Sequence, residues 1–211
     1  MATMSVPARK PAERERGNLV EEAVQLLSRE GIEGTTIGKL AERTGYSKGG
    51  IMAHFGSKRD MVLVLVGESV GRARAFFRDH LKGASTPGQR LSRTLETYGA
   101  YWISGLFEGG CPFLNLAVDA AEPSDEIAMA LKNAARTFIS DFAAIVRIGQ
   151  ATGEFRAEAD ADDIGERLMA LCIGCGWIYR MTGDTDIFAR MQPNVDAILE
   201  EITRRKAPVT V

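Results

Sequence analysis

Three groups of residues in this sequence could do chemistry. Cys172 and Cys175 have the CxxC spacing that thiol-redox sites and some metal sites use. Residues 160–163 carry three aspartates, the residue type that serves general acid–base catalysis. The stretch from Thr36 to Lys58 mixes basic, hydroxyl and glycine residues. Such residues contact phosphates and base edges in protein–DNA complexes, so this third group suggests nucleic-acid recognition.

The cysteine pair is better explained by packing than by redox chemistry. A thioredoxin-type CxxC opens a helix after a strand, whereas CIGC lies inside an expected apolar helix over about 160–181. Small residues such as Gly174 and Gly176 would let that helix pack closely. A helical thiol-redox enzyme using Cys172 and Cys175 remains the alternative hypothesis. With only two histidines in the chain, the sequence predicts no zinc site and no metal.

The aspartates are also explained without catalysis. They stand at the expected start of the 160–181 helix, where acidic side chains cap the helix and favour its dipole. The chain contains no GxSxG, P-loop, GxGxxG or HExxH motif. We therefore expect that the protein is not an enzyme and needs no cofactor.

The third group has the pattern of a helix-turn-helix. Thr35 or Thr36 can cap a short helix that Gly45 stops, and Ser47 can cap a second short helix that Gly56 stops. Short helix, glycine turn and short helix make this motif. An αα-hairpin with no DNA role has the same spacing, so the spacing alone leaves both interpretations open.

The outer face of the second helix favours the DNA-binding interpretation. Lys48, Gly49, Gly50 and His54 point away from the expected core. Each glycine costs on the order of 1 kcal/mol relative to alanine inside a helix. A bare first turn lets backbone amides and the positive end of the helix dipole approach phosphate or base edges.

The rest of the chain predicts helices that could position these groups. Apolar residues recur every three or four positions, and almost no segment alternates with period two. Residues 61–66, MVLVLV, could form a strand, but the preceding Ser57 cap favours a helix. The predicted fold is all-α. The helices are expected at about 13–31, 36–45, 47–56, 57–81, 88–107, 124–149, 160–181 and 190–205, with a shorter segment from Cys111 that Pro123 ends.

The run EGTTIGKLAERTGYSKGGIMAHFGSKRDMVLVL closely resembles the TetR family of transcriptional regulators. The resemblance is specific over about residues 13–65. Beyond them, GCPFLN at 110–115 and Thr152–Phe155 are similar in a looser way. Residues 1–11 carry Pro7, Pro11 and two basic residues and nothing to bury, so we expect a flexible arm there. The resemblance implies a three-helix DNA-binding head at 12–60 with the helix-turn-helix, and a larger effector-binding and dimerisation domain at 61–211. It also implies a homodimer that binds double-stranded DNA.

The resemblance assigns roles in the head. It implies phosphate contacts for Thr36, Ser47, His54 and Lys58, and places Lys48, Gly49 and Gly50 near bases. The family often has aromatic residues where Met52 and Ala53 stand here, so one contact is in doubt. Tyr46 stands where a small aliphatic residue is usual, and we include it among the expected DNA-binding residues.

The body is expected to hold an unknown effector and the dimer interface. By resemblance, a largely apolar ligand pocket is lined by Tyr98, Trp102, Phe107, Phe113, Phe138 and Phe142. Core packing is the default for aromatic residues at helical spacing. The apolar seams of the last helices are expected to form the dimer interface as a four-helix bundle, through Ile164, Leu168, Leu171, Cys175 and Ile178. The alternative is that these residues only close the protomer's own core.

Composition limits the class of protein. The net charge is -2 with 45% hydrophobic residues, so the whole chain is no polycation. Residues 1–60 hold 10 Lys/Arg and 8 Asp/Glu, and the remainder holds 16 and 20, so the head is slightly basic and the body acidic. Three cysteines make no disulfide framework, no apolar run approaches the roughly 18 residues of a membrane span, and no signal peptide is evident. We expect a cytoplasmic protein with no membrane partner.

Together these features predict a ligand-responsive repressor, released from a palindromic operator by a small, largely apolar effector. A DNA-binding activator is a further alternative, because the difference lies in where the operator sits.

Overall fold

The structure, a computed structural model, describes residues 11–119 and 125–203. These residues form helices joined by loops. One isolated antiparallel β-bridge pairs Phe155 with Thr203. The predicted all-α class is therefore confirmed. The helices are α1 (Pro11–Gly34), α2 (Ile37–Thr44), α3 (Lys48–Phe55), α4 (Lys58–His80), α5 (Pro87–Ser92), α6 (Thr94–Ile103), α7 (Pro112–Asp119), α8 (Glu126–Thr152), α9 (Ala161–Thr182), α10 (Ile187–Arg190) and α11 (Gln192–Ile202).

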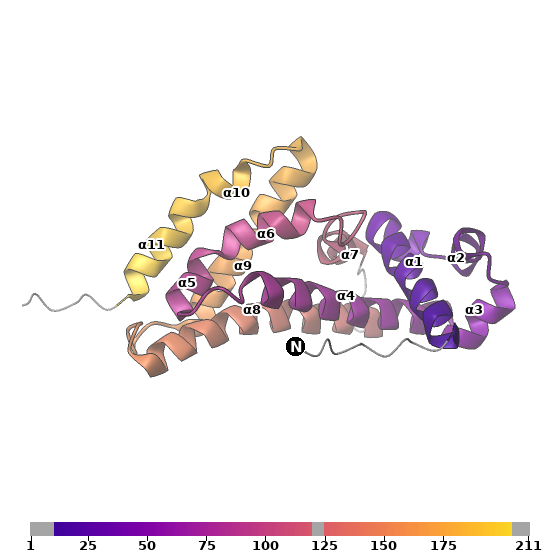
Figure 1. Cartoon of the computed structure of the whole chain (residues 1–211), viewed down its shortest axis with the longest axis horizontal. Helices are drawn as coiled ribbons and strands as arrows, with labels where there is room; N and C mark the ends of the chain where they lie inside the picture. The colour runs from indigo at the N-terminus through magenta and orange to yellow at the C-terminus, as the bar shows by residue number, and fades with distance from the viewer. Residues whose placement is uncertain (1–10, 120–124, 204–211) are drawn as a thin grey trace, which may run out of the picture.

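The first three helices and the start of α4 form a small head at one end of the molecule (Figure 1). The helical geometry of α1 breaks at Gly31, whose φ of 67° lies in the left-handed region that glycine accepts readily. Ile32 then folds back into the core with 9% of its surface exposed. Leu40 of α2 and Ile51 of α3 are fully buried, so both short helices are fixed to α1 and α4 by apolar packing.

Helix α4 connects the head to the body. It begins with Ser57 as its cap and runs without a break to His80, with α6 above it and α8 below it in Figure 1. MVLVLV therefore lies in a helix, as the cap predicted. The predicted domain boundary at residue 60 falls within this helix. A rotation of the body end of α4 would therefore move the head as well.

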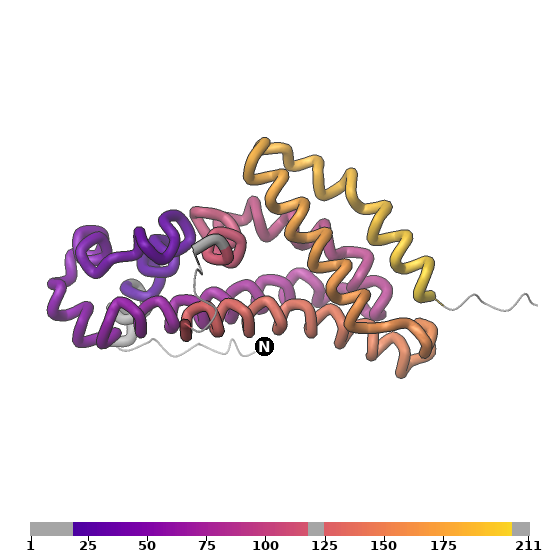
Figure 2. Tube along the Cα trace, turned by 180° about the vertical axis from the view of Figure 1, so that it is seen from behind, coloured from indigo at the N-terminus to yellow at the C-terminus, as the bar shows by residue number. Residues whose placement is uncertain are grey.

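The body is a layered bundle around α4, α6, α8 and α9. The tube in Figure 2 shows α9, in orange, crossing over α8, with α11 in yellow beyond it at the end away from the head. Gly165 makes the crossing possible, because a Cβ there would lie 2.7 Å from the carbonyl oxygen of Ile139 on α8. Ile164 and Leu168 fill the interior beside that crossing with 2% and 0% of their surface exposed.

Several boundaries differ from those that the sequence predicts. The helix expected at 88–107 is two helices, α5 and α6, and it ends at Ile103 because Gly105 turns the chain with φ of 72°. The helix expected at 190–205 is the short α10 followed by α11, and residues 204 and 205 lie outside the described part. Of the predicted arm, residues 1–10 also lie outside it, and Pro11 begins α1. Pro123, expected to end the α7 segment, is likewise not described.

None of the helices in the described ranges 11–119 and 125–203 is long and apolar enough to cross a bilayer.

Candidate nucleic-acid interface and effector site

The helix-turn-helix is built by three local devices. The Thr36 hydroxyl accepts a hydrogen bond from the Lys39 backbone N–H at 3.2 Å and caps α2. Gly45 ends α2 in the left-handed conformation, with φ of 74°. The Ser47 hydroxyl then accepts from the Gly50 N–H at 3.0 Å and caps α3. All three were predicted from the sequence, with Thr35 as an alternative cap. Thr35 is instead buried and donates its hydroxyl hydrogen to the Gly31 carbonyl.

The first turn of α3 is open on its outer side. Lys48, Gly49 and Gly50 are exposed there. A Cβ at Gly49 would meet nothing closer than the Ser47 hydroxyl at 4.0 Å, so no packing within the protein requires glycine at this position. A Cβ at Gly50 would lie 3.3 Å from the same oxygen, which is a tighter contact. Packing therefore does not explain glycine at position 49, whereas position 50 is more crowded.

Lys48 reaches across the turn to the start of α2. A Cβ placed on Gly38 would lie 3.8 Å from Lys48 Cε, 3.9 Å from its Nζ and 3.9 Å from the Thr36 hydroxyl. The structure therefore gathers Thr36, Gly38 and Lys48 at one place, although twelve residues of sequence separate the ends of the set. An ammonium group beside the N-terminus of a helix suits a phosphate or another electronegative group.

Lys48 is also the uncompensated cation of the head. Among the Lys and Arg side chains described between residues 19 and 60, it alone makes no ion pair. Its five counterparts are held by carboxylates: Arg29 by Glu108, Lys39 by Glu30, Arg43 by Glu22, Lys58 by Glu33, and Arg59 by Asp125 and Glu126. The positive potential available to a partner is therefore concentrated at the first turn of α3.

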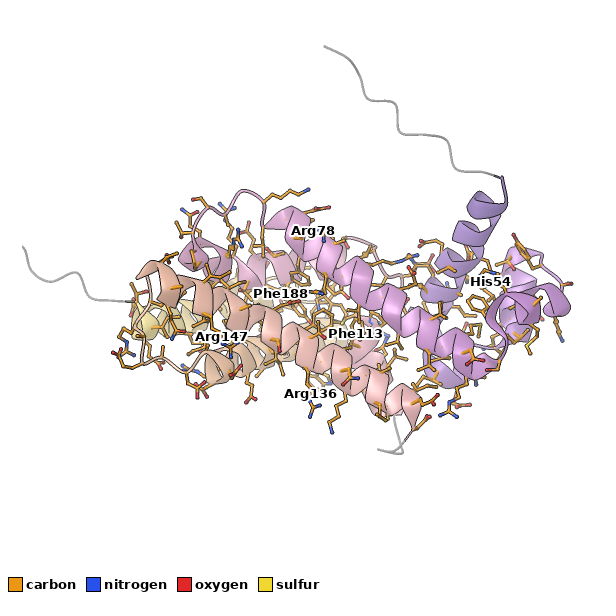
Figure 3. The ribbon with its side chains drawn as sticks, turned by 90° about the horizontal axis from the view of Figure 1, so that it is seen from below. His54, Arg78, Phe113, Arg136, Arg147 and Phe188 are labelled. Carbon is orange, nitrogen blue, oxygen red and sulfur yellow. The ribbon has the colours of Figure 1, made fainter. Side chains whose placement is uncertain are left out.

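The other predicted DNA-binding residues surround that turn in different ways. Tyr46 is half-buried and packs against the core, with its ring 3.9 Å from the position of a Cβ on Gly50. His54 lies on α3, edge-on to Phe55 with ring centroids 4.5 Å apart. Figure 3 shows His54 in the head, far from Phe113 and Phe188 in the body. Lys58, at the first residue of α4, is 3.4 Å from a Glu33 oxygen.

In the body, part of the predicted effector site is one aromatic cluster. Tyr98, Trp102 and Phe107 are 6%, 6% and 4% exposed. Tyr98 lies edge-on to Trp102 at 6.4 Å between ring centroids. The sequence analysis missed other members of this cluster, which are Phe76 and Phe77 of α4, Tyr101 of α6, Tyr179 of α9 and Phe188 of α10. The signal for Tyr101 was its position three residues after Tyr98, on the same face of α6.

Two polar atoms in the cluster are buried without a hydrogen-bond partner, namely the Tyr101 hydroxyl and the Trp102 indole N–H. The Cys111 thiol lies beside the Tyr101 hydroxyl, and the Tyr98 hydroxyl lies beside the Trp102 N–H. A thiol is only a weak partner, and neither contact has the geometry of a hydrogen bond. Burial raises the pKa of Tyr101 and of Cys111, so both stay neutral near pH 7. Unsatisfied buried polar groups cost about 1–3 kcal/mol each, which makes these two unusual in a native core.

The remaining predicted pocket residues are not in this cluster. Phe113 and Phe138 pair edge-on with ring centroids 5.2 Å apart, on α7 and α8. Both are half-buried, as is Phe142. The two aromatic groups contribute to one continuous core, but no described ring contact joins them. Tyr98, Trp102 and Phe107 therefore lie in the aromatic cluster around α6, whereas Phe113 lies on α7 and Phe138 and Phe142 lie on α8.

Some residues expected at the dimer interface belong to the protomer's own core. In the single chain, Ile164, Leu168 and Cys175 are 2%, 0% and 1% exposed, so a second chain cannot reach them in this conformation. The simpler alternative, that they close the core, describes these three correctly. Leu171 and Ile178 are half-buried and also pack on the core. The structure therefore places these residues in or against the protomer's own core rather than on an exposed face of α9.

The outer face of α9 carries a different apolar stripe. Ile173, Trp177 and Met181 are 39%, 56% and 66% exposed and follow one another at intervals of four residues. That spacing places them on one side of the helix. An exposed tryptophan between two aliphatic side chains is typical of a surface that a partner covers.

The loop between α6 and α7 joins the body to α1 of the head. The Gln25 side chain holds it at two points, donating to the Leu106 carbonyl at 3.1 Å and accepting from the Glu108 N–H at 2.8 Å. One residue further on, the Gly109 N–H donates to the Ser28 hydroxyl at 3.0 Å. Gln25 and Ser28 are both buried, so this attachment is shielded from water.

The same loop also contacts α6 and α9 of the body. A Cβ on Gly109 would lie 2.0 Å from the Ser28 carbonyl oxygen, so loop and helix backbones touch. The Gly109 carbonyl accepts a hydrogen bond from the Arg180 guanidinium of α9. Next to it, a Cβ on Gly110 would lie 2.3 Å from the Trp102 ring. The head, the aromatic cluster and α9 therefore meet at two glycines.

The cysteines and aspartates have structural roles. Cys172 and Cys175 are buried in α9, and burial raises the pKa of Cys172 far above its usual value. Gly176 lets the Trp102 ring lie against α9, because a Cβ there would be 2.6 Å from the indole nitrogen, whereas Gly174 is exposed. Asp160 caps α9 by accepting from the N–H groups of Asp162 and Asp163, as predicted. In the described part of the chain, no three His, Cys, Asp or Glu side chains gather as metal ligands would.

Comparison with known proteins agrees with this architecture. Residues 19–65 match the family described as bacterial regulatory proteins, tetR family, and residues 87–195 match the tetracyclin repressor-like C-terminal domain. The chain belongs to the TetR family. Members of this family are transcriptional regulators with a DNA-binding head, not enzymes, so the predicted class and the predicted lack of enzymatic activity both agree with it.

Individual relatives include one repressor with a similar sequence and solved structures with a similar fold. The repressor AcnR of Corynebacterium glutamicum is 38% identical over 69 residues, which are 33% of this chain and 37% of that one. A TetR regulator of Chloroflexus aurantiacus has a TM-score of 0.82 at 23% identity, covering 92% of this chain and 98% of that one. A regulator of Saccharomonospora viridis solved in complex with choline has a TM-score of 0.71 at 27% identity, covering 92% and 100%. The match to AcnR spans little more than a third of that repressor.

Proposed function

We propose that this TetR-family chain is a homodimeric repressor that binds a palindromic DNA operator and leaves it when a small, largely apolar effector binds the body. The observation that carries the proposal is the first turn of α3. It is capped, bare of side chains at two glycines, and carries the one head cation without a carboxylate partner between residues 19 and 60. Those features suit contact with a large anion, and packing within the protomer does not require glycine at position 49.

In the proposed complex, α3 enters the major groove with its N-terminal end toward the bases. Lys48 would read a base edge, and Gly49 and Gly50 would let the backbone come close. Thr36, Ser47, His54 and Lys58 would contact phosphates, with Tyr46 at the edge of the groove. Two such heads in a dimer require half-sites about 34–36 Å apart, one turn of B-DNA or a multiple of it.

A selection experiment tests DNA recognition. The purified protein is incubated with a random duplex library at two salt concentrations, and the retained duplexes are sequenced. Non-specific binding falls steeply as salt rises, whereas a specific complex keeps its base contacts. We expect an enriched palindrome that persists at the higher salt. Equal retention of all sequences at low salt and of none at high salt would contradict the proposal.

The proposed dimer uses the outer stripe of α9. Ile173, Trp177 and Met181 supply an apolar strip, and the exposed Ala170 and Gly174 beside it would allow another helix to approach closely. A twofold axis beside α9 would pair this stripe with its copy in the second chain. Sedimentation at micromolar concentration should show a dimer, and a monomer there would refute the arrangement.

The proposed effector site is the aromatic cluster around α6. It carries no charged side chain among the described buried residues, which favours a ligand that is mostly apolar. The Tyr101 hydroxyl and Trp102 N–H would each find an acceptor in a ligand that displaces part of the cluster. Choline, bound by the Saccharomonospora viridis regulator, belongs in the first screen as the polar comparison, because aromatic faces also attract quaternary ammonium groups. A thermal-shift screen in which only small polar metabolites stabilise the protein would contradict an apolar effector.

The α6–α7 loop is the proposed route from effector to DNA. A ligand that moves Trp102 displaces Gly110, and Gly109 carries that motion to Ser28 of α1 and to Arg180 of α9. Coupling requires that the effector bind one arrangement of the heads more tightly than the other. A repressor is favoured over an activator by the name of the Corynebacterium glutamicum relative. A reporter driven from the selected operator separates the two, since a repressor lowers its output. Such a regulator works on the chromosome, so we place it in the bacterial cytoplasm.

A further inference from the structure

The five carboxylate-held lysines and arginines described between residues 19 and 60 are not equivalent. Two of them, Lys39 of α2 and Lys58 of α4, sit three residues or fewer from the Thr36 and Ser57 helix caps. Their partners, Glu30 and Glu33, both come from the C-terminal end of α1, on either side of Gly31. Two glutamates of one short segment therefore pair with one lysine of α2 and one of α4, the helices on either side of α3 in the sequence.

These ion pairs are exposed and readily broken. The side chains of Lys39 and Lys58 are 49% and 39% exposed, and that of Glu33 is 92% exposed. Exposed ion pairs contribute about 0–1 kcal/mol, so a correctly placed phosphate can take the lysine from the carboxylate. Hydrogen bonding to Lys39 lowers the pKa of the Glu30 carboxyl. Glu30 therefore stays ionised at neutral pH and remains paired with that lysine.

We propose that Glu30 and Glu33 are specificity-determining residues. They keep Lys39 and Lys58 from binding phosphates unless base contacts have fixed the head on its operator. This inference rests on the proposed DNA binding and adds to it. On a non-operator duplex, the loosely placed head leaves both pairs intact, and only free cations such as Lys48 attract the DNA. On the operator, base contacts fix the head, and phosphates replace the carboxylates at both lysines.

The proposal makes a distinct prediction about salt dependence. Each additional lysine that engages a phosphate steepens the slope of log K against log salt by about one. For the wild-type protein, the slope should be steeper with operator than with a shuffled duplex of equal length. In Glu33→Gln, Lys58 is free to engage any phosphate. Its affinity for the shuffled duplex should then rise about two- to fivefold, and its slope should approach that of the operator.

The matched control is Glu42→Gln. Glu42 lies exposed on α2, makes no described ion pair, and loses the same unit of charge from the same head. We expect it to raise non-operator affinity much less than Glu33→Gln. The two substitutions are at exposed positions, so their melting temperatures should equal that of the wild type, which checks that the fold is intact.

A double-mutant cycle shows whether Glu33 acts through Lys58. In a Lys58→Ala background, Glu33→Gln should no longer raise affinity for the shuffled duplex, because the lysine that it restrains is gone. A gain that persists without Lys58, or an equal gain from Glu42→Gln, would reduce the effect to general charge and overturn the proposal. So would an equal rise in operator and non-operator affinity, since specificity would then be unchanged. If the wild-type protein selects no operator at all, the proposed DNA-binding function fails instead.

Discussion

The head and the body of this protein differ in where they place their candidate functional groups. In the head, buried Leu40 and Ile51 fix the short helices, hydroxyl caps and Gly45 set their ends, and the face of α3 is left open. In the body, long helices close over an aromatic interior, where Tyr101 and Trp102 bury polar atoms without partners. The head presents its functional groups to solvent in the state described, whereas the body conceals them.

The open face of the head and the filled interior of the body would bind their partners differently. An open, preformed face can bind a rigid partner such as duplex DNA without rearrangement, at little conformational cost. A filled aromatic interior can accept a ligand only by moving its own side chains. The loop at Gly109 and Gly110 lies where such movement would reach α1. In the proposed function, binding in the body is therefore the event that is coupled to conformational change.

The largest expected effect separates core from interface on α9. Leu168→Ala should lower the free energy of unfolding by about 2–5 kcal/mol, because a fully buried leucine leaves a cavity when it is truncated. Denaturant unfolding at one fixed protein concentration measures it. If the loss were below about 1 kcal/mol and the dimer fell apart instead, Leu168 would lie at the interface as the sequence predicted.

The next effect tests the open face of the head. Lys48→Ala should weaken operator binding by about 1–3 kcal/mol, the usual value of a good base contact, and leave the melting temperature unchanged. Lys82→Ala removes the same charge from an exposed site after α4 and serves as the control. Fluorescence anisotropy with a labelled operator measures both. Equal losses in the two variants would reduce the role of Lys48 to net charge.

A smaller effect tests the outer stripe of α9. Trp177→Glu should raise the dissociation constant of the dimer at least about tenfold, or 1.4 kcal/mol, because it buries a charge in an apolar contact. Met129→Glu is the matched control, since Met129 of α8 is 52% exposed and Trp177 is 56% exposed. Analytical ultracentrifugation over a concentration series compares the two. An unaffected Trp177→Glu dimer would place the twofold axis elsewhere.

The smallest expected effect concerns the buried thiol of the body. Burial raises the pKa of Cys172, so the thiol stays protonated at neutral and mildly alkaline pH and lacks the reactive thiolate. Iodoacetamide at pH 8 should leave Cys172 unmodified in the folded protein and label it in denaturant, as mass spectrometry of peptides would show. Rapid labelling of the folded protein would revive the thiol-redox alternative.

The two regions also differ in how far the sequence predicts them. Thr36, Gly45 and Ser47 act on neighbours within four residues, so the caps and turn of the head could be inferred from local spacing. The break between α5 and α6 and the choice of face on α9 depend on contacts between distant segments. Ile164 and Leu168 show the same helical period as Ile173 and Trp177, and only the packing of α8 against Gly165 decides which set is inside.

Only some residues of the proposed effector region were predicted, because the others come from segments that are distant in the sequence. Tyr98 and Trp102 lie in the aromatic cluster, but Phe77 and Phe188 come from α4 and α10, which are 111 positions apart in the sequence. The ion pair between Glu33 and Lys58 spans 25 positions and has no local signature. Contacts of this kind require the fold.

The central claim is that the first turn of α3 is bare because DNA must approach it, and Gly49→Ala tests this most directly. A Cβ there meets nothing within the protomer closer than 4.0 Å, and alanine favours the helix by up to about 1 kcal/mol. The measurement is operator affinity beside thermal unfolding, for the wild type and this variant. The account predicts an equal or higher melting temperature with operator affinity reduced about tenfold or more, the loss expected when one contact worth at least about 1.4 kcal/mol is blocked. Unchanged affinity in a well-folded Gly49→Ala protein would contradict it.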